Sequence, residues 1–438
     1  MAEQKYTISD IIETYISGDW GNDEPTEEAS CPVSCIRGAD IIPIYNSEFN
    51  NIPLRYISEK SLASRALQEG DIVIEKSGGS PTQSTGRVVY ISKELLEEKQ
   101  DVVCSNFCAA FRIKPEWDAK YVYYYLQHIY NAGVFFNFEG KTSGLKNLIM
   151  DTAFKSITIK KIAIETQRSI ATVLSTIESK MTVNRAINHY LEAMAKQLYD
   201  YWFVQFDFLD ANGNPYKSSG GKMVWNEKLK REIPEGWKDV CFKDICNVKR
   251  GASPRPIDEY MDQSHNGISW VKISDATSSE SPFLTLVKEH IIPEGGRHSV
   301  HVSPNTLIVS NSASPGIPKF IEIDACVHDG WLILTGYKEY YRYYFYYIIH
   351  MIRHNLLHMA SGSIFKNLKT DYLKEYVCLN PPQKVLQDYD KIVHPLMSSL
   401  LGKQLEIEEL TKERDRLLAL FMTGQVSVKQ LNNDLPVD

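Results

Sequence analysis

Two stretches of the chain repeat one spacing of mainly apolar residues, and this repeat constrains the fold more than any other feature. The spaced positions alternate in steps of four and three residues, and the second set lies 219 positions after the first. Such steps keep one stripe of a helix facing a partner, as in a coiled coil. The first stripe is Ile170, Leu174, Ile177, Met181, Asn184, Asn188, Leu191, Ala195, Leu198 and Trp202; the second is Tyr389, Val393, Leu396, Leu400, Lys403, Ile407, Leu410, Arg414, Leu417 and Phe421.

Each stripe predicts one long helix. No proline interrupts residues 166–203, and a helix of that length would be about 57 Å long at 1.5 Å per residue. The second helix is expected to start after Pro381 and Pro382, but Pro395 falls inside its first turns. A proline there should kink the helix or mark a restart. The alternative is two ordinary amphipathic helices in separate cores, although helices in globular proteins average only about 11–12 residues.

The segments that precede the two stripes also match each other in order, which predicts a domain and a long helix written twice. Short matches are common by chance, but several in one order with a slowly drifting shift are not. The shift is 235 positions for the first two pairs and 220 for the third. The matched pairs are residues 33–40 with 268–275, 71–74 with 306–309, and 146–148 with 366–368.

The globular parts combine strand and helix patterns. Runs rich in β-branched residues at 70–74 and 86–91, bounded by Gly, Ser and Pro, predict strands. Aromatic-rich runs at 121–130 and 340–353 predict helices. The expected fold class is therefore α+β, with two globular domains and two long helices in an antiparallel coiled coil.

The expected order of parts follows from these patterns. If a two-fold axis relates the halves, the helices run antiparallel, and pairing the stripes about their midpoints would place Asn188 against Lys403. Gly, Asn, Ser and Pro between the copies predict a connection without a core of its own. The expected parts are a first domain in residues 1–160, a helix in 161–206, a linker in 207–235, a second domain in 236–380, a helix in 381–425 and a tail in 426–438.

The composition excludes several classes of protein. With 43% hydrophobic and 24% charged residues, the chain has the balance of an ordinary globular protein. No apolar run approaches the roughly 18–20 residues that a bilayer span needs. The N-terminal residues lack the layout of a signal peptide, and the eight cysteines are expected to be reduced thiols in the cytoplasm. The net charge of −7 argues against a free-standing DNA-binding domain, which usually carries a basic excess.

Catalytic patterns are weak. Asn380-Pro381-Pro382-Gln383 resembles the catalytic tetrapeptide of amino-methyltransferases, but its last position is Gln instead of an aromatic residue. No glycine-rich cofactor loop follows a strand nearby. We therefore predict no catalytic residue and no cofactor in this chain.

Three other groups of residues have two interpretations each. The histidines and cysteines below have spacings that could ligate zinc, but a polar helix face and buried apolar thiols are favoured, so no metal is predicted. The tyrosines could stack on bases, but packing in the core is favoured. The groups are His350, His354 and His358; Cys31, Cys35, Cys104 and Cys108; and the tyrosines of residues 123–125 and 343–347.

Several motifs resemble those of one protein family. Three lie in the second copy: Ile233-Pro-Glu-Gly-Trp237, the segment 249–256 and the segment 267–275. With the linker segment 212–225 and the helix start 167–171, they closely resemble the specificity subunit of type I restriction–modification systems. The resemblance covers essentially the whole chain. The first copy departs from the pattern, because it opens with Asp19-Trp20-Gly21-Asn22, and the second helix start at 381–387 is a degenerate form of the family's motif.

This resemblance implies a non-catalytic DNA-recognition subunit. Each globular half would read one part of a split DNA target, and the helices would set the spacing and dock two methyltransferase (M) subunits. Those partners would methylate adenine with S-adenosylmethionine, and added motor–nuclease (R) subunits would use ATP and Mg to cut DNA. The alternatives are a self-contained DNA methyltransferase or nuclease with a fused specificity domain, and a coiled-coil adaptor unrelated to DNA.

Candidate DNA-contacting residues lie in matched segments that follow repeated strands. Readout of duplex DNA needs donors and acceptors at base edges, which Arg, Lys, Asn and Ser provide. Ordinary surface turns are the alternative for these segments. The candidates are Arg37, Lys76, Ser77, Ser143, Lys146 and Asn147 in the first copy, and Arg250, Lys272, Asn311, Ser312, Ser363, Lys366 and Asn367 in the second.

Overall fold

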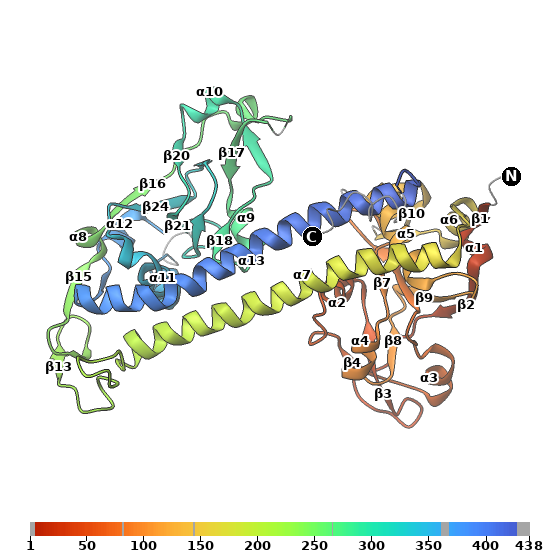
Figure 1. The fold of residues 1–438 in the computed structure, drawn as a ribbon, viewed down its shortest axis with the longest axis horizontal. Helices are drawn as coiled ribbons and strands as arrows, with labels where there is room; N and C mark the ends of the chain where they lie inside the picture. The colour runs from red at the N-terminus through yellow and green to blue at the C-terminus, as the bar shows by residue number, and fades with distance from the viewer. Residues whose placement is uncertain (1–4, 81–82, 143–144, 265, 361–367, 427–438) are drawn as a thin grey trace, which may run out of the picture. The chain divides into compact units, whose positions relative to one another are not determined.

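The computed structural model describes residues 5–80, 83–142, 145–264, 266–360 and 368–426 (Figure 1). It divides into two compact units, residues 1–184 with 406–438, and residues 185–405. Each unit holds one globular domain and one end of each long helix, so the predicted α+β fold class is confirmed. Within the described part of the chain, no helix is both long enough and apolar enough to cross a membrane.

The first globular domain is built on two small sheets. Its central strand β5 is buried along its whole length because side chains pack on both of its faces. Helix α5 (Ala119–Asn131) covers one face, and its start is capped by the Asp118 carboxylate, which accepts from Tyr121 N at 2.8 Å. The sheets, in strand order, are β2 (Ile12–Ser17), β9 (Cys108–Ile113), β5 (Ile72–Glu75) and β7 (Val88–Tyr90); and β4 (Leu54–Ile57), β3 (Cys31–Ile36) and β8 (Val102–Cys104).

Shorter elements complete this unit. The pairs β1–β12 and β6–β11 join segments that are distant in the chain, whereas β10 and β11 are neighbours in it, and short helices connect the strands. The sheets are β1 (Lys5–Thr7) with β12 (Thr158–Lys160), and β10 (Glu139–Thr142), β11 (Leu145–Leu148) and β6 (Ser77–Gly78); the helices are α1 (Ile8–Ile11), α2 (Ile41–Tyr45), α3 (Glu59–Arg65), α4 (Lys93–Glu98) and α6 (Met150–Ser156).

The second globular domain has the same plan. A five-stranded sheet and a four-stranded sheet form its centre, and helix α11 (Arg342–Ala360) packs on the former. In strand order the sheets are β16 (Asn247–Arg250), β24 (Trp331–Thr335), β21 (Thr306–Ser310), β22 (Pro318–Ile321) and β18 (Phe283–Leu284); and β19 (Glu289–Ile291), β17 (Ile268–Val271), β23 (Ala325–Val327) and β20 (Val300–Val302).

One hairpin, one pair of strands from the two ends of the domain, and four short helices complete the second unit in the part of the chain that the structure describes. The linker has no separate core, because Ile233 in its second strand is buried in the core of this domain. The pairs are β13 (Met223–Asn226) with β14 (Arg231–Pro234), and β15 (Lys238–Cys241) with β25 (Val377–Asn380); the helices are α8 (Phe242–Ile245), α9 (Ile273–Thr277), α10 (Pro293–Gly296) and α12 (Thr370–Lys374).

The register of the strands confirms that the two domains are copies. In the first domain β3 runs parallel to β8, with Ser34 opposite Val102; in the second, β17 runs parallel to β23, with Ser269 opposite Ala325. Ser269 lies 235 positions after Ser34, the shift found in the sequence. Since register fixes which side chains point to which face, the matching register gives both domains equivalent surfaces.

The two long helices are α7 (Ile164–Tyr199), which continues into a π-helical turn at Asp200–Val204, and α13 (Gln383–Thr423). None of the twenty stripe residues is exposed. In the first unit Glu178 of α7 lies 4.0 Å from Arg414 of α13, and in the second the rings of Trp202 and Tyr389 lie 5.8 Å apart. The stripes therefore face each other in an antiparallel sense, and the alternative of separate cores is wrong. The pairing of Asn188 with Lys403 stays a prediction.

Helix α13 runs through Pro395 without an interruption, so the predicted restart is wrong. An internal proline removes a backbone hydrogen bond and costs about 3 kcal/mol. The residues around it offset this cost, because Val393 and Met397 are fully buried, and burial of such a side chain contributes about 1.5–3 kcal/mol. Tertiary packing thus overrides the local preference.

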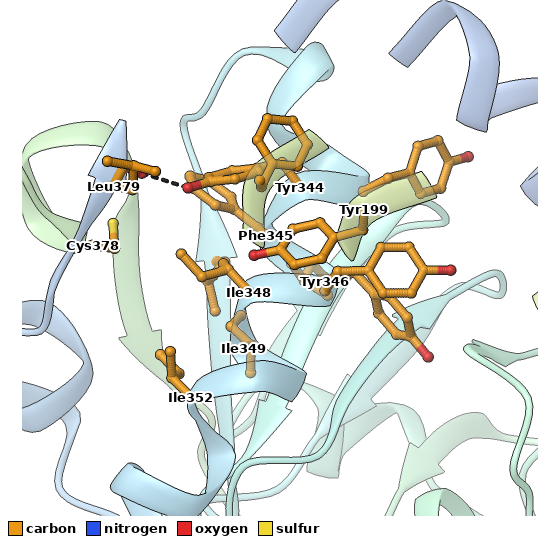
Figure 2. Packing of buried hydrophobic residues seen from close by; sticks show 14 of the residues in the cluster. Tyr199, Tyr344, Phe345, Tyr346, Ile348, Ile349, Ile352, Cys378 and Leu379 are labelled. Carbon is orange, nitrogen blue, oxygen red and sulfur yellow. Dashed lines mark hydrogen bonds between the residues drawn. The ribbon is translucent and has the colours of Figure 1, made fainter. Parts of the chain in front are cut away.

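The tyrosine-rich segments are core, as the sequence favoured. Four tyrosines of α11, Tyr343, Tyr344, Tyr346 and Tyr347, are at most 5% exposed. Figure 2 shows two of them, Tyr344 and Tyr346, in a cluster with Tyr199 and neighbouring isoleucines. The Tyr344 hydroxyl donates to the Leu379 carbonyl at 2.5 Å, which satisfies its polar end. A base-stacking role for these buried rings is excluded.

The cysteines also pack as apolar residues. Cys35, Cys104 and Cys108 are buried, and burial raises the pKa of Cys35 to about 12 and that of Cys108 to about 11. Thiols with such pKa values are protonated at neutral pH, whereas zinc binds the thiolate. Among the residues that the structure describes, no group of three or more potential ligands is arranged to hold a metal ion. The side chain of His358 lies outside the described residues.

Candidate nucleic-acid interface

In the first copy, two of the predicted loops lie side by side. Strand β6 pairs with β11, so Ser77 lies opposite Asn147 and Gly78 opposite Lys146. The Ser77 hydroxyl donates to Asn147 Oδ1 at 2.5 Å, and Leu148 N donates to the Lys76 carbonyl at 2.7 Å. Segments 70 residues apart in the chain thus form one polar surface at the end of β5, and contact of this surface with DNA stays a prediction.

The Lys146 ammonium is held within this surface. It pairs with Glu139 at 3.1 Å, donates to the Gln83 carbonyl at 3.3 Å and lies 4.8 Å above the Phe136 ring. Its side chain is only 15% exposed. In this arrangement Lys146 organises the loop, and contact with a phosphate would require it to leave Glu139. Ser143, the remaining candidate of these two segments, lies outside the described residues.

A buried ion pair that the sequence reasoning missed supports the same loop. Glu75, at the end of β5, is 2% exposed and accepts two hydrogen bonds from Arg87, at 2.8 and 2.6 Å. Gly38 and Gly78 press against this carboxylate, and a Cβ atom at Gly78 would lie 2.5 Å from Glu75 Oε1. The sequence does show a glutamate directly after a run of apolar strand residues. It does not show that Arg87 is the partner of this glutamate.

Arg37 and Lys272 occupy equivalent positions in the two domains. The backbone N–H of each donates to a carboxylate three residues later, Asp40 or Asp275, at 2.8 Å in both cases. The Arg37 guanidinium binds Asp40 through two nitrogens, and this hydrogen bonding raises the pKa of Arg37. Lys272 instead pairs with Glu289 at 2.6 Å. Both side chains keep about 40% of their surface exposed, 41% for Arg37 and 43% for Lys272, so their charges remain reachable.

In the second copy, Asp329 gathers several donors at one end of the sheets. Arg250 Nε donates to its carbonyl at 2.6 Å, the Ser253 hydroxyl donates to Oδ1 at 2.9 Å, and Arg255 lies 3.2 Å from Oδ2. The two guanidinium groups are exposed and point a positive surface toward solvent. The site adjoins a depression of about 420 Å³ lined by Ser253, Pro254, Arg255, Ile257, Trp270, Lys272, His328 and Asp329.

The titration states of this site follow from its contacts. Partial burial alone would raise the pKa of Asp329, but the hydrogen bond from Ser253 and the positive charge of Arg250 outweigh it and lower the pKa. Burial lowers the pKa of His328, so its ring is neutral at neutral pH. The site therefore presents two arginines held by one ionised carboxylate. Such preorganised guanidinium groups suit a guanine edge or a phosphate.

The remaining candidates of the second copy differ in accessibility. Asn311 is 3% exposed; its backbone N–H donates to the Gly330 carbonyl at 2.8 Å and its side chain donates to the Asp329 carbonyl at 3.3 Å. In this structure it therefore holds the loop of Asp329 and does not present its side chain to solvent. Ser312 beside it is half-buried. Ser363, Lys366 and Asn367 lie outside the described residues.

Asp329, Ser253 and Arg255 were not among the predicted site residues. Ser253 and Arg255 lie in the segment 249–256, whose resemblance to a family motif was a usable signal. Asp329 follows Arg250 by 79 positions, and no local pattern connects the two.

Comparisons with known proteins identify a family domain in the N-terminal part of the chain. Residues 4–193 match the family model described as the type I restriction modification DNA specificity domain. The first domain and the first part of α7 therefore match the DNA specificity domain of type I restriction–modification systems, and the second domain repeats the fold of the first.

Similar proteins match most of the length of the chain. The specificity subunit of the type I restriction enzyme MjaIX from Methanocaldococcus jannaschii is 23% identical over 90% of this chain and 88% of its own length. The specificity subunit of HindI from Haemophilus influenzae is 19% identical over 87% of this chain and 92% of its own. The crystal structure of the S subunit of a type I system from M. genitalium shares the fold, with a TM-score of 0.56, 16% identity and 95% coverage of both chains.

Proposed function

We propose that this chain is the non-catalytic DNA sequence-recognition subunit of a type I restriction–modification enzyme and reads a bipartite target with its two globular domains. One observation carries the proposal: the two domains place different polar and charged side chains on one shared backbone frame. Lys76 and Asn311 make equivalent backbone hydrogen bonds in the two domains, and the backbone N–H groups of Arg37 and Lys272 each donate to an aspartate three residues later. A common frame with different side chains suits two different half-sites.

The helices support a role as a spacer and a docking element. Stripe residues of α7 and α13 are buried against each other in both units, so neither helix is free to unwind separately. Two M subunits would dock on this chain, and R subunits would join the assembly. S-adenosylmethionine, ATP and Mg would act in those partners, and this chain would hold none of them. The partners would also supply phosphate contacts that a chain with a net charge of −7 lacks.

Exchange of one domain tests the proposal. Residues 236–380 are replaced by the equivalent domain of a relative, the chain is assembled with its M subunits, and methylated adenines are mapped on genomic DNA. We expect one half of the recognised sequence to change while the other half and the spacing stay the same. The reciprocal exchange of residues 1–160 is the matched control, and it should change the other half only. An unchanged methylated sequence after both exchanges would contradict the proposal.

The same preparation tests the alternative of a self-contained enzyme. The purified chain is incubated with duplex DNA and S-adenosylmethionine in the absence of M subunits, and transfer of a radiolabelled methyl group is counted. We expect no transfer by the chain alone and transfer after the M subunits are added. Transfer by the chain alone would establish a methyltransferase and would overturn the non-catalytic assignment.

A further inference from the structure

A cavity of about 270 Å³ lies within the second unit, between α11, the end of α7, β25 and the β13–β14 hairpin. Its walls are mainly aromatic and aliphatic. Figure 2 shows part of this wall: Tyr199, Tyr344 and Ile348 lie together, with Leu379 on the neighbouring strand. Pockets with apolar walls and a few polar groups are typical of small-molecule sites. The cavity shares no residue with the polar surfaces described above.

One cation, Arg231, lines this cavity. Its guanidinium lies 4.8 Å above the Phe206 ring, and its one described hydrogen bond is a long one, 3.4 Å, from an η-nitrogen to the Phe203 carbonyl. Its Nε–H is buried and has no acceptor among the residues that the structure describes. No carboxylate lines the cavity. Arg231 is therefore a partly buried charge with unused donor capacity.

The neighbouring lysines differ from Arg231, because each of them pairs with a carboxylate. Lys222, Lys228 and Lys230 pair with Glu235, Asp239 and Glu227 at 2.5, 2.8 and 3.0 Å. No such pair is found for Arg231 in the described part of the chain. A buried charge without a counter-ion is unfavourable, and an anion that reached the guanidinium would remove this penalty. Burial also lowers the pKa of Arg231, in keeping with the missing partner.

We propose that this cavity binds a small organic anion that consists of an aromatic ring and a carboxylate, with the carboxylate on Arg231 and the ring among Tyr199, Tyr344 and Ile348. The volume agrees with such a ligand, because a dry apolar cavity of about 150 Å³ holds benzene, and the larger space leaves room for a short acidic chain. Two parallel N–H···O bonds to a carboxylate are the geometry that guanidinium prefers. The proposal is independent of DNA recognition.

The test uses 3-phenylpropionate as the probe and its neutral amide, 3-phenylpropanamide, as the matched comparison. Binding of each to the full chain is measured by titration calorimetry at low ionic strength, with tyrosine fluorescence as a second readout. We expect the carboxylate to bind about tenfold or more tightly than the amide, a difference of about 1.4 kcal/mol. Equal affinities, or no binding of the carboxylate at millimolar concentrations, would overturn the proposal.

Variants locate the binding. R231M, which keeps an unbranched apolar side chain without the guanidinium charge, should bind both probes equally weakly, whereas K230M on the exposed neighbour should bind like the original chain. M351W tests the cavity without touching Arg231, because Met351 is 48% exposed at the lining and a larger ring there would fill the entrance. We expect M351W to lose binding of both probes. Unchanged carboxylate binding in R231M or in M351W would show that the anion binds elsewhere.

Discussion

The two globular domains make the same backbone hydrogen bonds at equivalent positions, but they carry different side chains at those positions. In the first, Lys76 N donates to the Phe107 carbonyl and the Lys76 carbonyl accepts from Leu148; in the second, Asn311 makes the same two bonds with Gly330 and Leu368, at 2.8 and 2.7 Å in both copies. Because these hydrogen bonds join backbone groups, they do not depend on the type of side chain. Both domains therefore keep one backbone arrangement while their side chains differ. The proposed recognition of two different half-sites would use this arrangement.

The contrast is sharpest at the end of the central strand. The first domain places Glu75 there, buried and bound to Arg87, whereas the second places Ser310, whose hydroxyl donates to the Ser314 carbonyl at 2.6 Å and accepts from Ile317 N at 2.9 Å. One copy therefore supports its loop with a buried ion pair and the other with a neutral hydroxyl. The buried ion pair is more sensitive to substitution than the hydroxyl, because removal of one partner leaves a buried charge unpaired.

The largest expected effect is on this ion pair. E75Q leaves the Arg87 guanidinium, 17% exposed, without its counter-charge, and we expect the free energy of unfolding of the first domain to fall by about 3–5 kcal/mol. S310A, at the equivalent position, should cost only about 1 kcal/mol in the second domain. Urea denaturation followed by hydrogen exchange assigns each loss to its domain. The double variant E75L/R87M should recover most of the stability, and a loss from it as large as that from E75Q would refute this account.

The next prediction concerns DNA affinity, and it tests whether the charge of an exposed side chain contributes to binding. R255A removes an exposed guanidinium from the Asp329 site, and we expect affinity of the partner-bound complex for its target to fall by about 1–3 kcal/mol, with a smaller salt dependence if the contact is to phosphate. Filter binding at several salt concentrations measures both quantities. K288A, an exposed lysine outside the site, is the control. An affinity and a salt slope equal to those of the original complex would exclude Arg255 from the interface.

A third difference lies in how each domain contacts the helices. In the first unit Glu178 of α7 accepts from the hydroxyls of Tyr45 and Tyr124, at 3.0 and 2.6 Å. In the second, Gln404 of α13 contacts Ser281 and donates to Thr285 at 2.6 Å. One contact includes a titratable group and the other an amide.

This difference predicts that the contact of Glu178 with its domain depends on pH and that the contact of Gln404 does not. Burial raises the pKa of Glu178 above its ordinary value of 4.5, so just above that pH the folded state keeps a proton that the unfolded state has lost. Stability from this group is therefore greatest below about pH 4.5 and falls as the pH rises through the folded-state pKa, by up to about 1.4 kcal/mol per pH unit. E178Q should flatten this slope in unfolding curves measured across that range, and Q404A should not. The same slope in E178Q would contradict the assignment.

The smallest expected effect concerns one backbone position. Gly78 and Ala313 lie at equivalent positions, and both have a positive φ, 149° and 56°. A positive φ is unfavourable for alanine by about 1–2 kcal/mol, so A313G should raise the thermal midpoint of the second domain slightly. G78A should lower that of the first, because its Cβ would collide with Glu75. Calorimetry of both variants measures these shifts, and shifts of the same sign would show that the two loops are not equivalent.

The sequence determined the features that depend on local periodicity. The four-three spacing in residues 170–202 and 389–421 predicted helices that face each other, because a stripe at 3.5 residues per turn is a property of neighbouring positions. The shift of 235 positions likewise predicted two domains of one fold and the matched position of Arg37 and Lys272. Both predictions depend on which residues become buried, and the order of apolar residues in the sequence indicates this directly.

Only the tertiary structure decided which polar groups meet. Glu75 meets Arg87, Arg250 meets Asp329 across 79 positions, and Arg231 meets no carboxylate among the described residues. The continuity of α13 through Pro395 was decided in the same way, by the burial of Val393 and Met397. The physical reason is range: apolar burial repeats with the period of a helix or strand, whereas an ion pair or hydrogen bond depends on where two distant strand ends come to lie.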